Sequence, residues 1–260
     1  MAVHFILQPK GGVGKSYVAS ILAQYLLDKG INVEGFDLDP SNPTFSEYAT
    51  LPVSRFNLLE DKKGLGQDQV RQIDNNKFNA FTEAIQNAEA DTELIVDCGS
   101  SAFIPVINYL KRFRIEEWFA SLNHPVVVHS LIKGGGEMIE TLEATDTLLK
   151  QFPESPFVLW LNEYQFPVTI QNKSFIETPI YKAHSKRIID VIPLPQYTSG
   201  FLSGDLDKMI EARLTLKEAL EKGAFNILSQ RALFLYKKDL WERLDLFYKN
   251  YLSYLKGGSK

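Results

Sequence analysis

The sequence places a glycine-rich loop, Lys10-Gly11-Gly12-Val13-Gly14-Lys15-Ser16, between an apolar run at residues 3–8 and a helical pattern at residues 16–29. Glycines allow the backbone N–H groups of such a loop to turn inward and surround phosphate oxygens. The helix that follows directs the positive end of its dipole toward the same anion. Lys15 can reach the β- and γ-phosphates of a nucleotide, and the Ser16 hydroxyl can ligate Mg²⁺. The stretch therefore predicts a phosphate-binding site at a strand–loop–helix junction.

The loop departs from the general phosphate-loop pattern at one position. Pro9 stands five residues before Gly14, where that pattern has a glycine, and a second lysine, Lys10, follows it. The alternative interpretation is a glycine-rich turn with unrelated lysines. The Gly-Lys-Ser sequence at the start of a helical pattern favours the phosphate site.

The rest of the chain alternates short apolar runs with helical patterns. Strands are expected at residues 3–8, 31–38, 93–96, 125–132, 157–161 and 188–192, and helices at residues 16–29, 78–90, 103–113, 137–150, 208–219 and 228–255. This alternation predicts an α/β fold, a mostly parallel sheet with helices on both faces in a doubly wound three-layer sandwich. Residues 60–74 are expected to form a polar surface loop. With no repeat or linker in the sequence, we expect one domain over residues 1–260, with a C-terminal helical extension at about 228–256.

Composition excludes several classes of protein. The 28 Lys and Arg residues against 32 Asp and Glu residues give a net charge of −4, which argues against a wholly basic nucleic-acid binder. The single cysteine, Cys98, cannot form a disulfide within one chain and suits a reducing compartment; we expect it to be a small buried residue. The sequence has no apolar run of about 18 residues, so we expect no membrane-spanning helix. The N-terminus has the pattern of a strand rather than that of a signal peptide.

Polar side chains end several of the predicted strands. Asp37-Leu38-Asp39-Pro40 closes the second strand, Asp97 follows Leu94-Ile95-Val96, and Asn162 follows the run at 157–161. A phosphate loop needs acidic partners to organise Mg²⁺ for hydrolysis, and an amide can both donate to and accept from a purine edge. The alternatives are an Asp-Pro turn and a loop-starting asparagine, both common at strand ends. The histidines at 124, 129 and 184 share no metal-ligand spacing, so we expect structural or surface roles for them.

The glycine-rich loop resembles the deviant Walker A motif of the ParA/MinD superfamily of ATPases. In that family the early lysine reaches across a nucleotide-sandwich dimer to the phosphates of the partner. The resemblance therefore implies that Lys10 acts in trans and Lys15 in cis, both as catalytic residues. Tyr17 departs from the family pattern, because relatives commonly have a threonine there whose hydroxyl contacts the α-phosphate.

The strand-end residues resemble further motifs of the same family. By resemblance, Asp39 orients or activates the attacking water and is the third catalytic residue, while Asp37 helps to position the water shell of Mg²⁺. Asp97 resembles the Walker B carboxylate in the outer sphere of the metal, next to Ser16. The residues after it, 98–101, depart from the Thr-Pro-Pro often found in relatives.

Base recognition is also inferred by resemblance. Asn162 resembles the adenine-contacting asparagine of the family, and Pro193 and Pro195 resemble the loop that flanks the base. The expected nucleotide-contacting residues are Lys10, Gly11, Gly12, Val13, Gly14, Lys15, Ser16, Tyr17, Asn162 and Pro193. The expected metal-site residues are Ser16, Asp37 and Asp97, the two aspartates acting through water.

Several longer stretches are similar to one subfamily, the TraL-type conjugal-transfer proteins of broad-host-range plasmids. They are residues 39–45, 96–105, 158–164, 173–175 and 211–215, so the resemblance extends from residue 3 to about 247. It implies a bacterial cytoplasmic ATPase that uses ATP and Mg²⁺, forms a homodimer in the ATP state and assists conjugative DNA transfer through a type IV secretion system. Its implied partners are conjugation or secretion machinery proteins, with recruitment to the membrane or the nucleoid as a further option.

Alternatives remain open at this point. A nucleotide-gated adaptor that hardly hydrolyses ATP would account for Tyr17 and for the altered residues 98–100, whereas the charge of −4 disfavours a pure nucleic-acid binder. The glycines after Lys133 form either a strand–helix turn or part of a dimer face near the nucleotide. The predicted C-terminal helix carries an apolar stripe with lysines between its members. Such a helix fits a membrane surface, as in MinD-like relatives, or a DNA surface, but a stripe at this spacing is more often a core or dimer contact.

Overall fold

The computed structural model describes residues 2–60, 72–170, 173–194, 200–221 and 223–257. Most of the predicted loop at 60–74 lies outside these residues, and so does Pro195.

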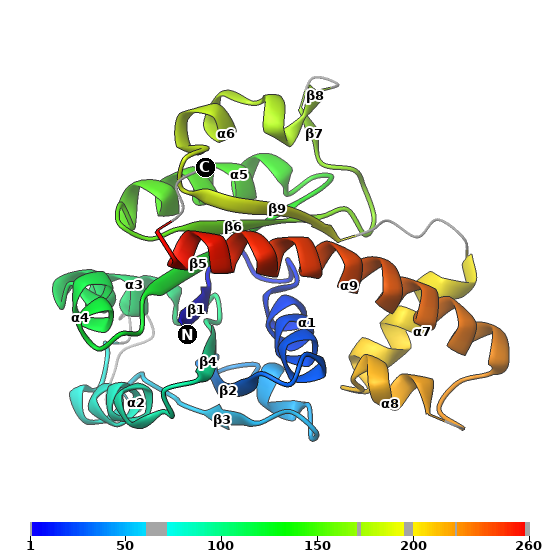
Figure 1. The fold of residues 1–260 in the computed structure, drawn as a ribbon, viewed down its shortest axis with the longest axis horizontal. Coiled ribbons are helices and arrows are strands. Elements are labelled where there is room, and N and C mark those ends of the chain that lie inside the picture. Colours follow the sequence, from blue (N-terminus) through cyan, green and yellow to red (C-terminus); the bar gives the residue numbers. More distant parts are fainter. Residues whose placement is uncertain (1, 61–71, 171–172, 195–199, 222, 258–260) are drawn as a thin grey trace, which may run out of the picture.

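A seven-stranded sheet forms the middle of the molecule, and each strand runs parallel to its neighbours in the order β3-β2-β4-β1-β5-β6-β9 (Figure 1). The strands are β1 (Val3–Ile6), β2 (Asn32–Asp37), β3 (Val53–Arg55), β4 (Thr92–Asp97), β5 (Val126–Lys133), β6 (Phe157–Asn162) and β9 (Ile188–Leu194). The central strands β1 and β4 are buried along their whole length, because helices cover both faces of a parallel sheet. A separate antiparallel pair joins β7 (Thr169–Ile170) to β8 (Lys173–Ser174).

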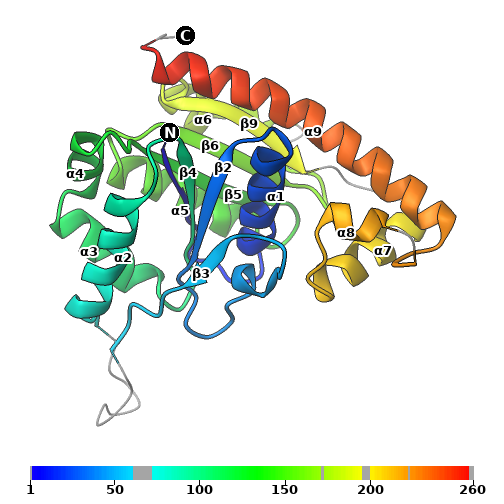
Figure 2. The same ribbon diagram turned by 60° about the horizontal axis from the view of Figure 1, so that its bottom comes forward.

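Helices cover the two faces of this sheet and create two apolar cores. The helices are α1 (Lys15–Asp28), α2 (Asn75–Asn87), α3 (Phe103–Arg112), α4 (Ile115–Ser121), α5 (Met138–Gln151), α6 (Pro179–His184), α7 (Gly200–Glu211), α8 (Leu216–Leu220) and α9 (Ile227–Leu255), with 3₁₀ turns η1 (Phe45–Glu47) and η2 (Phe175–Glu177). One core contains α1, α7, α8 and α9, and the other contains α2 to α6, on the opposite face (Figure 2). The predicted three-layer α/β sandwich is confirmed.

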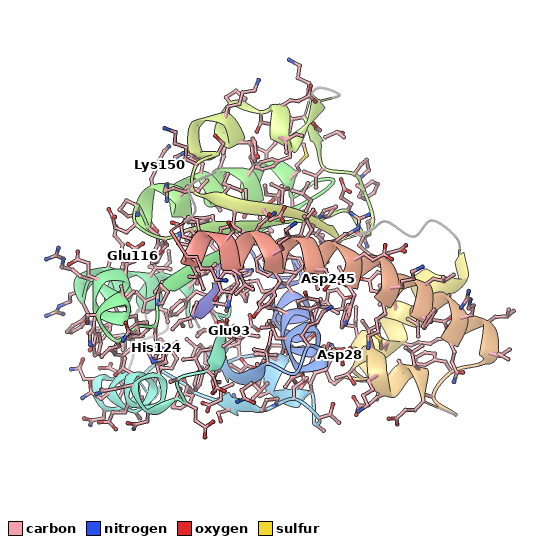
Figure 3. The ribbon with its side chains drawn as sticks, in the orientation of Figure 1. Asp28, Glu93, Glu116, His124, Lys150 and Asp245 are labelled. Carbon is pink, nitrogen blue, oxygen red and sulfur yellow. The ribbon has the colours of Figure 1, made fainter. Side chains whose placement is uncertain are left out.

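Helix α9 crosses the α1 face of the sheet from the α7–α8 corner to the amino ends of the strands (Figure 1). Its apolar stripe is buried in the core: Leu233, Tyr236, Leu240, Leu244, Phe247 and Tyr251. Two ion pairs of 2.5 Å join it to the end of α1, Lys237 with Asp28 and Asp245 with Lys29 (Figure 3). Among the described residues, no helix, α9 included, has both the length and the apolar composition to cross a membrane.

The structure differs from the sequence-based expectation at one predicted helix and at several short elements. The single helix expected at 208–219 was wrong, because α7 ends at Glu211 and α8 begins at Leu216. Arg213 takes a left-handed backbone conformation, with φ of 55°, which ends the first helix. Thr215 and Glu218 then form a capping box that starts the second. Strand β3 and helices α4 and α6 were not predicted.

Candidate functional site

The glycine-rich loop joins β1 to α1 at the carboxyl edge of the sheet. Gly12 and Gly14 have φ of 70° and 100°, a left-handed conformation that favours glycine. Gly14 is the N-cap of α1, so the unpaired N–H groups of the first helical turn open into the loop. The loop therefore has two glycines with positive φ and an open helix N-terminus, at the position where the sequence predicts a phosphate site.

Lys15 lies inside this loop with only 7% of its surface exposed. Its Nζ donates a hydrogen bond of 2.9 Å to the carbonyl oxygen of Lys10, across the loop. Burial lowers the pKa of Lys15, while the nearby Asp97 and Asp39 raise it. The side chain that was expected to contact phosphate in cis is thus already within the loop and close to two carboxylates.

Asp97 ends strand β4 and is 1% exposed. Neither of its carboxylate oxygens makes a hydrogen bond of normal geometry. Burial raises the pKa of Asp97 to about 7, although the adjacent Ser16 hydroxyl and Lys15 lower it. A buried carboxylate without partners is costly, which makes this position suited to a cation or its bound water.

The other two aspartates of the predicted site lie on the neighbouring strand and just after it. Asp37 is directly opposite Asp97 in the register between β2 and β4. Its two oxygens accept hydrogen bonds from the backbone N–H groups of Asp39, at 3.0 Å, and Ser46, at 2.9 Å. Burial raises the pKa of Asp37, and these hydrogen bonds lower it. Asp37 therefore orders the loop after β2 in addition to its expected metal-site role.

Asp39 is fixed by the residues on both sides of it. Its Oδ1 accepts from the N–H groups of Ser41 and Asn42, at 2.9 and 3.0 Å. A Cβ atom added to Gly99 would lie 2.2 Å from Cγ of Asp39, so only glycine fits there. The sequence did not predict this close packing of Gly99 on Asp39, although a glycine two residues after Asp97 was a readable signal. Cys98, between them, is buried as expected.

A cavity of about 230 Å³ opens beside the loop. Its lining residues come from the loop, α1, the ends of β5 and β6 with the residues after them, β9, α7 and α9: Gly12, Gly14, Tyr17, Lys133, Gly134, Asn162, Tyr164, Gln165, Leu194, Leu206, Asp207, Ile210 and Tyr236. Such a largely apolar cavity with a few polar groups has the character of a small-molecule site. Asn162 lines it as expected, whereas the predicted Pro193 does not, and its neighbour Leu194 does.

Two of the cavity residues also make contacts that the sequence did not predict. The Asn162 amide donates to the carbonyl oxygen of Val13, at 2.9 Å, and accepts from the N–H of Tyr164, at 3.2 Å. Asn162 therefore holds the glycine-rich loop in place. The Tyr17 hydroxyl is 2.5 Å from the hydroxyl of Tyr236, which links the first turn of α1 to α9. Tyr236 had no predicted role in the site.

The lysine expected to act in trans points away from the loop. Nζ of Lys10 is 2.9 Å from a carboxylate oxygen of Glu140 on α5, and this contact raises the pKa of Lys10. Lys133 forms a second ion pair nearby, because its Nζ is 3.3 Å from a carboxylate oxygen of Glu137. The same Nζ is 3.4 Å from the carbonyl oxygen of Gly12. The turn after Lys133 thus borders the loop, a role that the sequence left open.

Residues 4–222 match the CobQ/CobB/MinD/ParA nucleotide binding domain. Two Escherichia coli proteins, both named protein TraL, are 33% and 34% identical to this chain over 244 residues, which is 94% of this chain and 97% of each relative.

Solved structures of low identity also align with the chain. The MinC:MinD cell division protein complex of Aquifex aeolicus is 15% identical over 93% of this chain and 96% of that chain, with a TM-score of 0.48. A putative plasmid partition protein of Borrelia burgdorferi bound to AMPPNP is 17% identical over 97% and 98%, with a TM-score of 0.46.

Proposed function

The chain belongs to the CobQ/CobB/MinD/ParA nucleotide-binding family, and from that premise we propose that it is a Mg²⁺-dependent ATPase acting as a dimeric switch. Its resemblance to TraL-type proteins supports a role in conjugative DNA transfer through a type IV secretion system, in the bacterial cytoplasm. In this proposal residues 1–260 act as one nucleotide-binding unit, with α9 as its helical extension.

One observation carries the proposal. The buried carboxylate of Asp97 makes no hydrogen bond of normal geometry and lies, at the end of β4, near Lys15 and the Ser16 hydroxyl of a loop whose Gly12 and Gly14 have positive φ. Structural carboxylates in protein interiors are hydrogen bonded, so a buried one without partners indicates a place for a ligand.

The residues present fit a magnesium ion that is held mainly by the nucleotide. Within the described part of the chain, no three His, Cys, Asp or Glu side chains are arranged to hold a metal by themselves. The Ser16 hydroxyl would be the direct protein ligand, and Asp97 and Asp37 would hold water around the ion. Bound Mg²⁺ would neutralise phosphate charge and fix the geometry of phosphoryl transfer.

The chain supplies the remaining contacts. Backbone N–H groups of residues 11–16 would bind the phosphate oxygens, and Lys15 would exchange the Lys10 carbonyl for a phosphate. Asp39, held at Oδ1 by two backbone N–H groups, would orient the attacking water. In the proposed dimer, Lys10 would leave Glu140 and reach the phosphates bound by the partner.

ATP turnover by the wild type, Lys15→Ala and Asp39→Ala tests the site. We expect both variants to lose at least about 100-fold in turnover, because phosphoryl transfer depends on positioning and charge neutralisation. Lys150→Ala, a surface lysine on α5, is the matched control (Figure 3). Equal turnover in all four proteins would refute the assignment.

The dimer is tested separately by sedimentation with and without ATP–Mg²⁺. We expect an ATP-dependent dimer in the wild type and in Lys150→Ala, and none in Lys10→Ala. A dimer that forms equally well in Lys10→Ala would remove the proposed trans role of this lysine.

A second candidate is a nucleotide-gated adaptor with little hydrolysis that binds DNA, membrane or secretion components. The Tyr17 hydroxyl favours it, because its bond to Tyr236 occupies the group expected at the α-phosphate. Isothermal titration with ATP and a parallel phosphate-release assay distinguish the two. Tight binding without phosphate release, even with transfer proteins present, would favour the adaptor.

A further inference from the structure

The first turns of α9 expose an apolar face that points away from the core. The side chains of Ile227, Leu228, Phe234 and Leu235 are 82%, 69%, 45% and 42% exposed, respectively. Helical spacing puts them on one side of α9, opposite the buried stripe. We define the α9 patch by these residues and the two cations on the same side: Ile227, Leu228, Arg231, Phe234, Leu235 and Lys238.

The patch combines apolar surface with positive charge. The Arg231 guanidinium lies 5.2 Å from the centre of the Phe234 ring, which keeps it against the apolar surface. Lys238 is 3.9 Å from Glu242, and both side chains are more than half exposed, so this pair is weak and Lys238 can exchange it for another carboxylate. Acidic residues return only toward the end of the patch, at Asp239 and Glu242. They disfavour an anionic lipid surface, which would contact this whole side of the helix.

The α9 patch lies on the side of α9 that faces away from the cavity beside the glycine-rich loop. Tyr236, next to Leu235 in the helix, lines the cavity and bonds to Tyr17 after the phosphate loop. The segment after Asp39 contacts the same corner of the molecule, because Glu47 pairs with Arg213 at 2.8 Å. The cavity therefore has a direct contact with α9 through Tyr236, whereas the segment after Asp39 contacts the α7–α8 connection beside it.

We propose that the α9 patch docks an amphipathic helix of a partner protein, one with an apolar stripe and acidic residues two turns apart. Arg231 and Lys238 are separated by two helical turns, about 10 Å, which matches two carboxylates at the same spacing on a facing helix. The exposed aliphatic and aromatic side chains would meet the apolar stripe of that helix. We further propose that nucleotide binding changes the affinity of this docking, a part that rests on the proposed function.

A synthetic peptide tests the docking. The probe is a labelled helical peptide of about 20 residues with leucines on one face and glutamates seven residues apart, long enough to be helical. Fluorescence anisotropy with the full chain should show saturable binding. Arg231→Glu and Phe234→Ser should each weaken it by about tenfold or more, whereas Leu246→Ser, a similarly exposed residue farther along α9, should not.

Three results would overturn the docking. They are no saturable binding of the peptide, equal binding of a peptide with lysines in place of the glutamates, and no loss in either patch variant. Self-association through the patch in sedimentation, or binding to phosphatidylglycerol vesicles that Arg231→Glu abolishes while the peptide does not bind, would assign the patch to another occupant and also refute the proposal.

Nucleotide coupling is read from the same titration with and without ATP–Mg²⁺, in the wild type and Lys15→Ala. We expect ATP to shift the peptide affinity of the wild type only. Fluorescent-nucleotide binding is measured in parallel, so a chain that binds nucleotide but not peptide refutes the docking and leaves the proposed function intact. A chain that binds peptide but no nucleotide refutes the proposed function and leaves the docking intact.

Discussion

Strand β4 carries a buried carboxylate near each end, and the two have opposite surroundings. At the amino end, Glu93 accepts hydrogen bonds from the N–H of Ala2 at 2.7 Å, from Nε2 of His4 at 3.2 Å and from the Tyr251 hydroxyl at 3.0 Å (Figure 3). At the carboxyl end, neither carboxylate oxygen of Asp97 makes a hydrogen bond of normal geometry, although the adjacent Ser16 hydroxyl lowers its pKa. Burial acts to raise the pKa of both groups, yet the hydrogen bonds hold that of Glu93 below its usual value while that of Asp97 rises to about 7.

The cluster at Glu93 has one consistent arrangement of hydrogens. The Trp160 indole N–H donates to Nδ1 of His129 at 3.0 Å, so the proton of neutral His129 lies on Nε2. That proton is donated to Nδ1 of His4 at 2.8 Å, so His4 carries its own on Nε2, facing Glu93. Burial lowers the pKa of His129 well below its usual value, which keeps it neutral. His129 is thus structural, as expected.

The difference between the two ends separates stability from function on a single strand. Fully satisfied polar clusters stabilise one packing arrangement, whereas an unsatisfied buried charge costs stability and is retained where a ligand completes it. Glu93 therefore belongs to the architecture, and Asp97 to the proposed nucleotide site.

The largest effect is expected from Glu93→Gln. The amide would disrupt a cluster built around a carboxylate, so the free energy of unfolding should fall by about 2–4 kcal/mol in urea denaturation. Glu83→Gln, an exposed residue on α2, should leave it within about 0.5 kcal/mol. A Glu93→Gln protein as stable as the wild type would show that the cluster contributes nothing to the fold.

Asp97→Asn is expected to raise the free energy of unfolding instead of lowering it. Because the folded pKa of about 7 exceeds the ordinary value of 3.8, the folded state binds this proton more tightly, and wild-type stability falls as pH rises through that interval. Without nucleotide, the free energy of unfolding of Asp97→Asn should therefore exceed that of the wild type by about 1–3 kcal/mol at pH 8. Near pH 4 the two values should be equal. Urea denaturation at the two pH values measures this, and a destabilised variant at pH 8 would contradict the comparison.

Asp97→Asn should also lose most of the stabilisation that ATP–Mg²⁺ gives the wild type. ATP–Mg²⁺ should stabilise the wild type by its binding free energy and Asp97→Asn by much less.

A smaller loss is expected from Tyr251→Phe. It removes the hydroxyl that donates to Glu93 and leaves the ring in the core, so the free energy of unfolding should fall by about 1–2 kcal/mol. Tyr254→Phe, one turn further along α9, is the matched control. Equal values for the two variants would mean that α9 is anchored by its apolar stripe alone.

The smallest effect on stability is expected from Glu140→Gln. Its ion pair with Lys10 is solvent-exposed, so the free energy of unfolding should change by less than about 0.5 kcal/mol. If the pair holds Lys10 back from a partner, sedimentation should instead detect a larger ATP-dependent dimer fraction. An unchanged dimer fraction would show that the pair has no bearing on the proposed switch.

Features that depend on local sequence patterns could be predicted, whereas features that depend on long-range contacts could not. Local patterns specified the phosphate loop, the aspartates at the ends of two strands and the alternation of apolar and helical runs. Strand β3 was missed because its three residues, half-buried or exposed, carry no apolar pattern. The break between α7 and α8 was readable in principle, since Thr215 and Glu218 have the spacing of a capping box.

Long-range pairings left no local signal. His4 and His129 meet only because β1 and β5 are neighbours, with Ile6 opposite His129, and no spacing in the sequence indicates this. Tyr236 joins the cavity for the same reason, because the crossing of α9 over α1 depends on packing rather than on local pattern.

The position of Tyr251 also has a consequence for biosynthesis. The cluster around Glu93 includes Ala2 and Tyr251, which are far apart in the sequence, so it cannot close until Tyr251 has been synthesised. At about 5–20 residues per second, the ribosome needs on the order of 10–50 s to pass from Ala2 to that tyrosine. During this interval the buried carboxylate lacks one of its donors, and a polypeptide released ahead of Tyr251 would never acquire it.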